Sequence, residues 1–212
     1  MTTMTDATRI AYLGPVGTFC EAALLTMPIA QGAVAVPAKS VQSALDAVRA
    51  GDADCALIPI ENSVEGSVAV TLDELAAGMR LVIVDEVAVA VRFALMARSG
   101  VDLYDVRTVA SHPHALAQVR GWLAEHLPEA TAIPALSTAG AAAALAVEPA
   151  PFDAAVAPRL AADRYGLAVL ADGIGDTEEA QTRFVLVRRP GAIPEPTGSD
   201  KTTLSLYMKQ DE

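Results

Sequence analysis

Residues 40–60, SVQSALDAVRAGDADCALIPI, contain a helix pattern followed directly by a strand pattern. Apolar residues recur three and four positions apart from Val41 to Val48, which predicts the buried face of an amphipathic helix. Gly51 marks the end of that helix, because glycine is common just beyond a helix C-terminus. The apolar run at 56–60 then predicts a strand buried on both faces. This stretch therefore predicts a helix that packs on a sheet.

The same alternation extends toward the N-terminus. Residues 9–13 and 34–37 are short apolar runs that predict two further strands. Between them, Thr18 and Glu21 have the spacing of a capping box, with Thr18 as N-cap, and the helix that follows should stop at Pro28. Strands that alternate with helices in this way predict a parallel sheet covered on both faces.

Toward the C-terminus the alternation resumes after a strand-rich stretch at 81–97, which we interpret as the crossover into a second lobe. A short helix at 71–77 precedes this crossover. Beyond it we expect strands at 108–111, 130–136, 154–158, 167–170 and 182–187, one helix from Pro113 to Leu127 and another from Thr138. The ending Asp-x-Ala-x-x-Pro occurs at both 54–59 and 153–158, a weak internal echo that fits two similar lobes.

The composition indicates a folded, acidic protein. Apolar residues make up 52% of the 212 residues, charged residues make up 19%, and the formal net charge is −11. No Lys/Arg cluster provides the basic face of a nucleic-acid binder, so we expect no nucleic-acid partner. Charged residues such as Asp85 and Arg92 interrupt the apolar stretches, and residues 1–8 are polar, so we expect neither a membrane span nor a secretory signal. Cys20 and Cys55 lie far apart in apolar surroundings, which favours reduced thiols in a cytoplasmic protein.

Polar residues follow predicted strands at four places where we expect a helix to begin. These places are Gly17-Thr18, Asn62-Ser63, Ser111-His112 and Ser137-Thr138. In a parallel α/β sheet, ligands bind beyond the carboxyl ends of the strands, where helix N-termini offer free N–H groups to an anion. The pattern therefore favours a small anionic ligand. The alternative is that each Ser or Thr only caps its own helix.

Two further motifs bear on the chemistry. Thr182-Arg183-Phe184 opens a buried strand, and an arginine there needs an anionic partner, either a carboxylate of the protein or a ligand. His112 and His114 are two residues apart, but no other His or Cys cluster supports a metal site, so no metal is expected. The sequence also lacks the nucleophile-elbow, P-loop and dinucleotide-binding motifs.

Taken together, five segments resemble the prephenate dehydratases, enzymes of phenylalanine biosynthesis. The segments are 14–23, 59–66, 111–118, 137–139 and 182–184, in the order found in that family. The resemblance extends across roughly residues 9–190. It implies two α/β lobes similar to the type II periplasmic binding proteins, with the site in the cleft between them.

The resemblance also implies the reaction, a decarboxylating dehydration. Prephenate would lose its ring carboxylate as CO2 and its C4 hydroxyl as water, and the product would be phenylpyruvate. Because the product ring is aromatic, the driving force is already present in the substrate, and neither an organic cofactor nor a metal is implied. The expected protein is therefore a cytoplasmic lyase of phenylalanine and aromatic amino-acid biosynthesis, within the shikimate pathway and chorismate metabolism.

Residue roles follow from the same resemblance. Thr182 matches the favoured donor to the leaving hydroxyl, Arg183 would anchor a carboxylate or order the site, and Phe184 would pack against or beside the ring. Glu61 would orient its polar neighbours. The positions expected to bind substrate are Thr18, Glu61, Asn62, Ser63, Ser111, Gln118, Ser137 and Thr138.

The expected division of the chain has two lobes, a linker and a short last segment. Residues 1–78 plus 174–190 should form the first lobe, 79–173 the second, and 191–200 a Pro/Gly-rich linker. Residues 201–212 resemble the start of the ACT domain that usually follows in this family and binds phenylalanine. We therefore expect a truncated ACT domain, and L-phenylalanine as an effector only of a chain in which that domain is complete.

Three other interpretations remain open. The same bilobal fold could bind an aromatic or keto acid without chemistry. Arogenate dehydratase would carry out the same reaction on the amino-acid analogue of prephenate. A third interpretation is a regulatory partner of another shikimate-pathway enzyme. Because members of the family form dimers or tetramers, we also expect a homo-oligomer.

Overall fold

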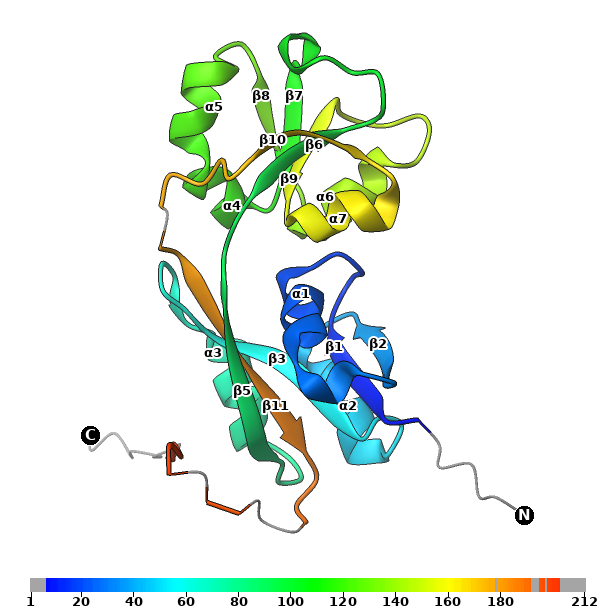
Figure 1. Ribbon diagram of the computed structural model, residues 1–212, viewed down its shortest axis with the longest axis vertical. Coiled ribbons are helices and arrows are strands. Elements are labelled where there is room, and N and C mark those ends of the chain that lie inside the picture. The colour runs from blue at the N-terminus through cyan, green and yellow to red at the C-terminus, as the bar shows by residue number, and fades with distance from the viewer. Residues whose placement is uncertain (1–6, 178, 192–194, 197, 203–212) are drawn as a thin grey trace, which may run out of the picture.

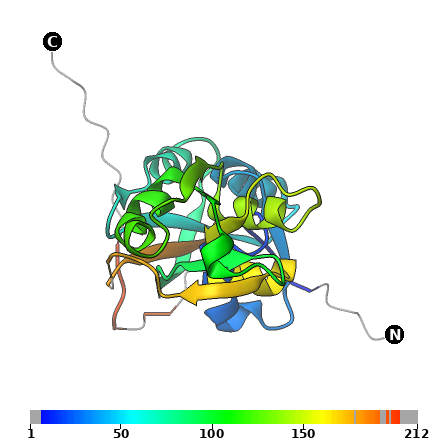
Figure 2. The same ribbon diagram turned by 90° about the horizontal axis from the view of Figure 1, so that it is seen from above.

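The computed structural model describes residues 7–177, 179–191, 195–196 and 198–202. Two α/β lobes lie one above the other along the long axis, and the chain passes between them twice (Figure 1). In the view from above, the second lobe lies over the first (Figure 2). The expected architecture of two α/β lobes is therefore confirmed.

The first lobe is built on a six-stranded sheet. Its strands are β1 (Arg9–Leu13), β2 (Val34–Ala38), β3 (Cys55–Asn62), β4 (Gly66–Ser67), β5 (Val82–Ala90) and β11 (Gln181–Arg188). They lie in the order β2-β1-β3-β11-β5, and β4 pairs with β3 beyond this path. The parallel pairing expected for the first three strands is confirmed. β11 adds an antiparallel component, because it returns from the second lobe and enters the sheet from the opposite end.

Helices cover both faces of this sheet, as the alternating pattern predicts. On one face lies α1 (Phe19–Thr26), packed in a core with Tyr12 and Phe184. On the other face lie α2 (Val41–Ala50) and α3 (Ala69–Ala76), and the core under α2 includes Ile58 and Val185. A short 3-10 helix, η1 (Pro28–Ala30), follows α1.

The ends of α2 are where the sequence predicts them. Ser40 and Ser43 form a reciprocal capping box, in which each side chain accepts the backbone N–H of the other residue. Gly51 ends the helix with φ 87°, in the left-handed region that favours glycine. Local sequence therefore determines both boundaries of this helix.

The second lobe contains a five-stranded sheet in the order β10-β6-β9-β7-β8. Its strands are β6 (Ala94–Ala97), β7 (Thr108–Ser111), β8 (Thr131–Pro134), β9 (Ala154–Ala157) and β10 (Ala168–Asp172). Its helices are η2 (Leu103–Asp105), α4 (Pro113–Gln118), α5 (Arg120–His126), α6 (Thr138–Leu145) and α7 (Arg159–Tyr165). The described residues thus contain every strand that the sequence predicts between 108 and 187.

The single helix expected from Pro113 to Leu127 is wrong, because the structure divides it at Val119 into α4 and α5. The cause is Asp176, which lies far away in the sequence. Its carboxylate accepts the N–H groups of Gly121 and Trp122 at 2.8 and 3.1 Å and so caps the start of α5.

Two further expectations about helices need correction. No helix begins at Asn62-Ser63, because β3 extends to Asn62 and a turn leads into β4 before α3 begins. Helix α7 (Arg159–Tyr165) was not expected from the sequence, since it is short and its buried residues are alanines.

The division of the chain between the lobes differs from the expected one. β5 pairs with β11 along its length and belongs to the first sheet, although we expected residues 79–173 to form the second lobe. The crossovers lie at 91–93 and 173–180, where the N–H of Val91 donates to the carbonyl of Ala180 at 2.7 Å. Most of the expected ACT segment, residues 203–212, lies outside the described residues.

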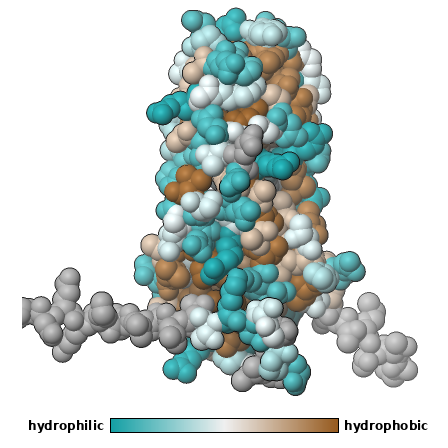
Figure 3. Space-filling view, turned by 60° about the vertical axis from the view of Figure 1, so that its left-hand side comes forward, coloured by the Kyte–Doolittle hydropathy of each residue, from teal (hydrophilic) through white to brown (hydrophobic). Residues whose placement is uncertain are grey.

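The surface mixes polar and apolar residues. On the face shown in Figure 3, hydrophilic and hydrophobic residues are interspersed over both lobes. Within the ranges given above, none of the helices combines the length and the apolar character needed to cross a bilayer.

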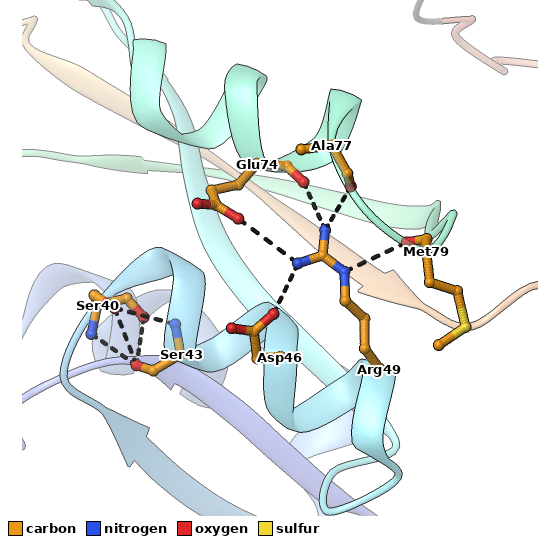
Figure 4. Close-up of polar contacts among 7 residues, drawn as sticks. All are labelled: Ser40, Ser43, Asp46, Arg49, Glu74, Ala77 and Met79. Atoms are coloured by element: carbon orange, nitrogen blue, oxygen red, sulfur yellow. Dashed lines mark hydrogen bonds and ion pairs between the residues drawn. The ribbon is translucent and has the colours of Figure 1, made fainter.

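Arg49 joins α2 to the C-terminal end of α3 (Figure 4). Its guanidinium donates to the carbonyls of Glu74, Ala77 and Met79 at 2.6, 3.0 and 3.3 Å, and it also pairs with Asp46 at 2.9 Å. The side chain is only 13% exposed. Arginine has the planar, multiple donors that this cluster of carbonyls requires, so the last turn of α3 is fixed to α2.

We expect Arg49→Met to lower the free energy of unfolding by about 2–3 kcal/mol, because it leaves helix-end carbonyls unpaired in a half-buried place. Arg80→Met is the matched control, since Arg80 is exposed and follows the same helix. Urea unfolding followed by circular dichroism measures both variants. Equal stability of the two variants would contradict this role of Arg49.

Candidate active site

One edge of the first sheet faces the second lobe. β5 ends there before the chain crosses over, so β11, antiparallel to β5, begins there. β3 is antiparallel to β11 and therefore ends at the same edge, together with the parallel strand β1. The polar residues after β3 and at the start of β11 consequently meet between the lobes (Figure 1).

Asn62 and Thr182 form the central contact at this edge. They are directly opposed in the ladder, and Asn62 Nδ2 donates to Thr182 Oγ1 at 2.7 Å. Asn62 Oδ1 accepts the N–H groups of Val64 and Glu65 at 2.8 and 3.0 Å, which fixes the amide orientation. Thr182 is 8% exposed. Because its oxygen accepts from Asn62, the hydroxyl hydrogen of Thr182 is left to be donated elsewhere.

Ser63 and Gln181 flank this contact and hold the two strands together. The N–H of Ser63 donates to the carbonyl of Gln181 at 2.9 Å, and the N–H of Gln181 donates to Ser63 Oγ at 2.9 Å. The hydroxyl of Ser63, which we expected to bind substrate, therefore fixes the backbone next to Thr182.

Arg183 lies on the opposite face of the sheet from Thr182, as alternation along a strand requires. Its guanidinium approaches two protein carboxylates, with Nη1 at 3.3 Å from Glu61 and Nε at 3.5 Å from Glu86. The Nε atom is buried and makes no hydrogen bond to a described residue. The sequence left open whether the anionic partner of Arg183 is a protein carboxylate or a ligand. In this structure, protein carboxylates lie beside it.

Phe184 is a core residue in this structure. A β-bulge separates it from Arg183, and it is 2% exposed in the cluster under α1, with Cys20 and Leu24. It fixes the strand that carries Thr182, on the face covered by α1.

The remaining candidates mostly make structural hydrogen bonds. Ser111 is fully buried and donates to the carbonyl of Val156 at 2.6 Å. Ser137 caps α6 by accepting the N–H of Gly140 at 2.9 Å, and Thr138 is the first residue of that helix. Gln118 donates to the carbonyl of His114 at 3.2 Å. No described side-chain contact joins these residues to Thr182.

Thr18 and Glu21 form only half of the expected capping box. Thr18 Oγ1 accepts the N–H of Glu21 at 3.2 Å and donates to the carbonyl of Leu13 at 3.0 Å. The Glu21 carboxylate accepts from the N–H of Gly17 instead of that of Thr18. The Gly17 N–H group at this helix start is therefore already used by a protein carboxylate.

The second lobe reaches this edge through the start of α4. His114 Nδ1 lies 3.2 Å from a carboxylate oxygen of Glu65, which belongs to the turn after β3. His112 caps α4 with Nδ1, which accepts the N–H of His114 at 3.3 Å. Within the described ranges, no group of three His, Cys, Asp or Glu side chains is arranged to hold a metal ion.

The comparisons with known proteins give one consistent result. A sequence model of prephenate dehydratase matches residues 10–192. The prephenate dehydratase of Amycolatopsis methanolica is 52% identical over 197 residues, which are 92% of this chain and 63% of that protein. The chain belongs to the prephenate dehydratase family.

Two solved structures are similar to this chain over most of its length. Prephenate dehydratase from Arthrobacter aurescens, solved in complex with L-Phe, is 50% identical with a TM-score of 0.86, over 91% of this chain and 63% of that chain. GqqA, described as a novel type of quorum quenching acylase, is 33% identical with a TM-score of 0.75, over 89% of this chain and 67% of that chain. The chain spans about 63% of the length of the Amycolatopsis and Arthrobacter prephenate dehydratases.

Sequence reasoning missed a second group of residues in this member of the prephenate dehydratase family. Arg164 and Tyr165 of α7 contact the start of α1 in the other lobe. The signals that could have found α7 are Pro158 at its start and Gly166 in the left-handed region at its end. Neither signal indicates what the helix would contact.

His112 should make stability depend on pH. Burial, and next His114, lowers the pKa of His112 from its ordinary value of 6.5, against an opposing effect of Glu65. A histidine whose pKa is lowered on folding stabilises the folded state above pH 6.5, and this contribution is lost as the pH falls through the folded-state pKa. The cap agrees with this direction, because only the neutral ring accepts at Nδ1.

We therefore expect His112→Asn, which keeps a capping acceptor and removes the titrating ring, to lose less stability than the unchanged chain on acidification. Urea unfolding at about pH 7.5 and about pH 5 measures this difference. An identical loss in both proteins would contradict the assignment.

Proposed function

We propose that the chain catalyses the decarboxylating dehydration of prephenate to phenylpyruvate, CO2 and water, as an enzyme of L-phenylalanine biosynthesis. The observation that carries the proposal is the contact between Asn62 and Thr182, which leaves a threonine hydroxyl free to donate a hydrogen bond between the lobes. Family membership supports prephenate as the substrate, because two relatives that are 52% and 51% identical to this chain are prephenate dehydratases.

The proposed step balances without any co-reactant other than a proton. The bond between the ring and its carboxylate breaks, and its electron pair enters the ring as CO2 leaves. The C4–O bond breaks, and the departing hydroxide takes a proton to become water. Thr182 would donate its hydrogen bond to that departing oxygen and relay the proton.

Asn62 makes Thr182 a better donor. Negative charge develops on Thr182 Oγ1 as its hydrogen moves toward the leaving group, and the N–H of Asn62, 2.7 Å away, stabilises that charge. Hydrogen bonds in series also polarise one another, which strengthens the donation from the hydroxyl. The turn N–H groups hold the Asn62 amide in the required orientation.

The other residues would bind or position. Arg183 would order the site through Glu61, because its guanidinium lies between two protein carboxylates. Ser63 would position Thr182 through Gln181. The second-lobe positions would help to bind the substrate from the other lobe, and these are Ser111, Gln118, Ser137 and Thr138.

We also propose limits for the two lobes, a location in the cell and a state of assembly. Of the described residues, the first lobe would comprise 7–90 and 181–190, and the second 91–177 and 179–180, in keeping with sheet membership. A cytoplasmic location is supported by the two cysteines, Cys20 and Cys55, which are buried and free. Assembly into a homo-oligomer is proposed by analogy with the family.

Competing activities predict different results. Arogenate dehydratase activity needs recognition of an ammonium group, and a bilobal receptor needs no hydroxyl held as a donor. GqqA, the relative described as an acylase, is 33% identical to this chain, whereas the Amycolatopsis prephenate dehydratase is 52% identical. Prephenate dehydration is therefore the activity to test first.

We expect Thr182→Val, which keeps the shape of the side chain and removes the hydroxyl, to lower kcat about 10²- to 10⁴-fold. Thr182→Ser should retain more activity. Phenylpyruvate formation from prephenate, read by its absorbance in base, measures both. Thr26→Val is the control, since that hydroxyl bonds within α1 to Ala23. Full activity of folded Thr182→Val would exclude the proposed role.

Asn62→Asp tests the direction of the hydrogen bond. An aspartate can still accept the N–H groups of the turn, but it accepts from Thr182 instead of donating to it. We expect kcat to fall about 10²- to 10³-fold, the usual effect of removing one stabilising donor. The same assay, with circular dichroism to verify folding, gives the result. An unchanged kcat would show that Asn62 does not assist Thr182.

A further inference from the structure

An ion pair and a hydrogen bond join the start of α1 in the first lobe to α7 in the second. Arg164 Nη2 lies 2.7 Å from Glu21 Oε1. Tyr165 Oη donates to the backbone carbonyl of Val16 at 2.7 Å. Both partners in the second lobe are neighbours at the end of one helix, so the contacts form or separate together.

Gly17 allows the two lobes to approach closely at this place. A Cβ atom on Gly17 would lie 2.9 Å from Cα of Ala161 in α7, closer than such atoms come in proteins. Gly17 also has φ 86°, in the left-handed region. Backbone of one lobe therefore touches backbone of the other, which leaves little tolerance in how the lobes meet.

The Glu21 carboxylate is shared between the lobes. The residue is 4% exposed, one carboxylate oxygen accepts the N–H of Gly17 in its own lobe, and the other oxygen faces Arg164. A carboxylate buried this far needs a partner charge as well as hydrogen bonds. Burial, and next the charge of Glu21, raises the pKa of the neighbouring Tyr12 to about 12, against an opposing effect of Arg164.

The opposite side of the inter-lobe contact is more open to solvent. There, the His114 and Glu65 side chains are 62% and 40% exposed, whereas the Arg164 and Glu21 side chains are 41% and 6% exposed. Exposed ion pairs contribute little, because water and salt screen them. The contact at α1 and α7 is therefore the one with the means to hold the lobes together.

We propose that Glu21 and Arg164 form an inter-lobe clamp that holds the lobes closed over the substrate. The clamp positions and does not react: Glu21 fixes the loop before α1, and α1 covers the sheet face that carries Thr182. Its effect on turnover rests on the proposed function. Its effect on the shape of the free protein does not.

Opening the clamp should weaken substrate binding more than it slows the reaction. Prephenate that binds productively only to the closed form has an apparent affinity reduced by the fraction of closed protein. We expect Arg164→Gln to raise KM about tenfold and to change kcat less than about twofold, because saturating substrate restores closure. X-ray scattering of the free protein should show a larger radius of gyration than for the unchanged chain.

Arg159→Gln is the matched control. Arg159 lies on the same helix and pairs with Asp172 of its own lobe at 2.9 Å, so its loss removes an ion pair without touching the first lobe. We expect its KM and radius of gyration to equal those of the unchanged chain. A merely destabilising effect of losing an arginine from α7 would appear in both variants.

Glu21→Gln completes a double-mutant cycle with Arg164→Gln. The double variant should have a KM close to that of the more affected single variant, because either change alone opens the clamp. Unchanged KM and radius of gyration in Arg164→Gln would overturn the clamp, as would independent, multiplying effects of the two changes. Absence of turnover in every protein, with a larger radius only in the clamp variants, would refute the proposed function and leave the clamp standing.

Discussion

Strand β11 lies between β3 and β5 and runs antiparallel to both, and the geometry of the site depends on this insertion. It opposes Thr182 to Asn62, residues 120 positions apart in the chain, at 2.7 Å. The same strand directs Arg183 to the other face, between Glu61 and Glu86. One ladder thus places the Thr182 side chain on the sheet face that α1 covers and the Arg183 guanidinium on the other face.

Local patterns were sufficient for much of the fold. The apolar residues from Val41 to Val48 and the glycine at 51 were enough to predict where α2 begins and ends, because a helix with its own caps needs no distant partner. The break at Val119 could not be foreseen, since Asp176 causes it from the other crossover. Helix α7 was missed for a related reason, as alanines carry little periodic signal.

The sequence offers candidate site residues but not their geometry. Resemblance to a family identified Asn62 and Thr182, yet no local rule shows that one donates to the other. Hydroxyls such as Ser63 and Ser111 look alike in sequence whether they face a ligand or a backbone group. Only the fold shows that both are already hydrogen-bonded, to Gln181 and Val156. Glu21 similarly looked like a helix cap, and its partner Arg164 lies in the other lobe.

The hydrogen bond between Val91 and Ala180 brings together the two points at which the second lobe leaves and rejoins the first. The second lobe is thus a continuous insertion, and the first is assembled from two separated pieces of chain. During synthesis, the insertion emerges whole before β11 exists. Until β11 arrives, β3 and β5 have no strand between them, and both present bare edges that invite pairing with another chain. β11 is the last of the described strands of this sheet to be synthesised, and its arrival covers the facing edges of β3 and β5.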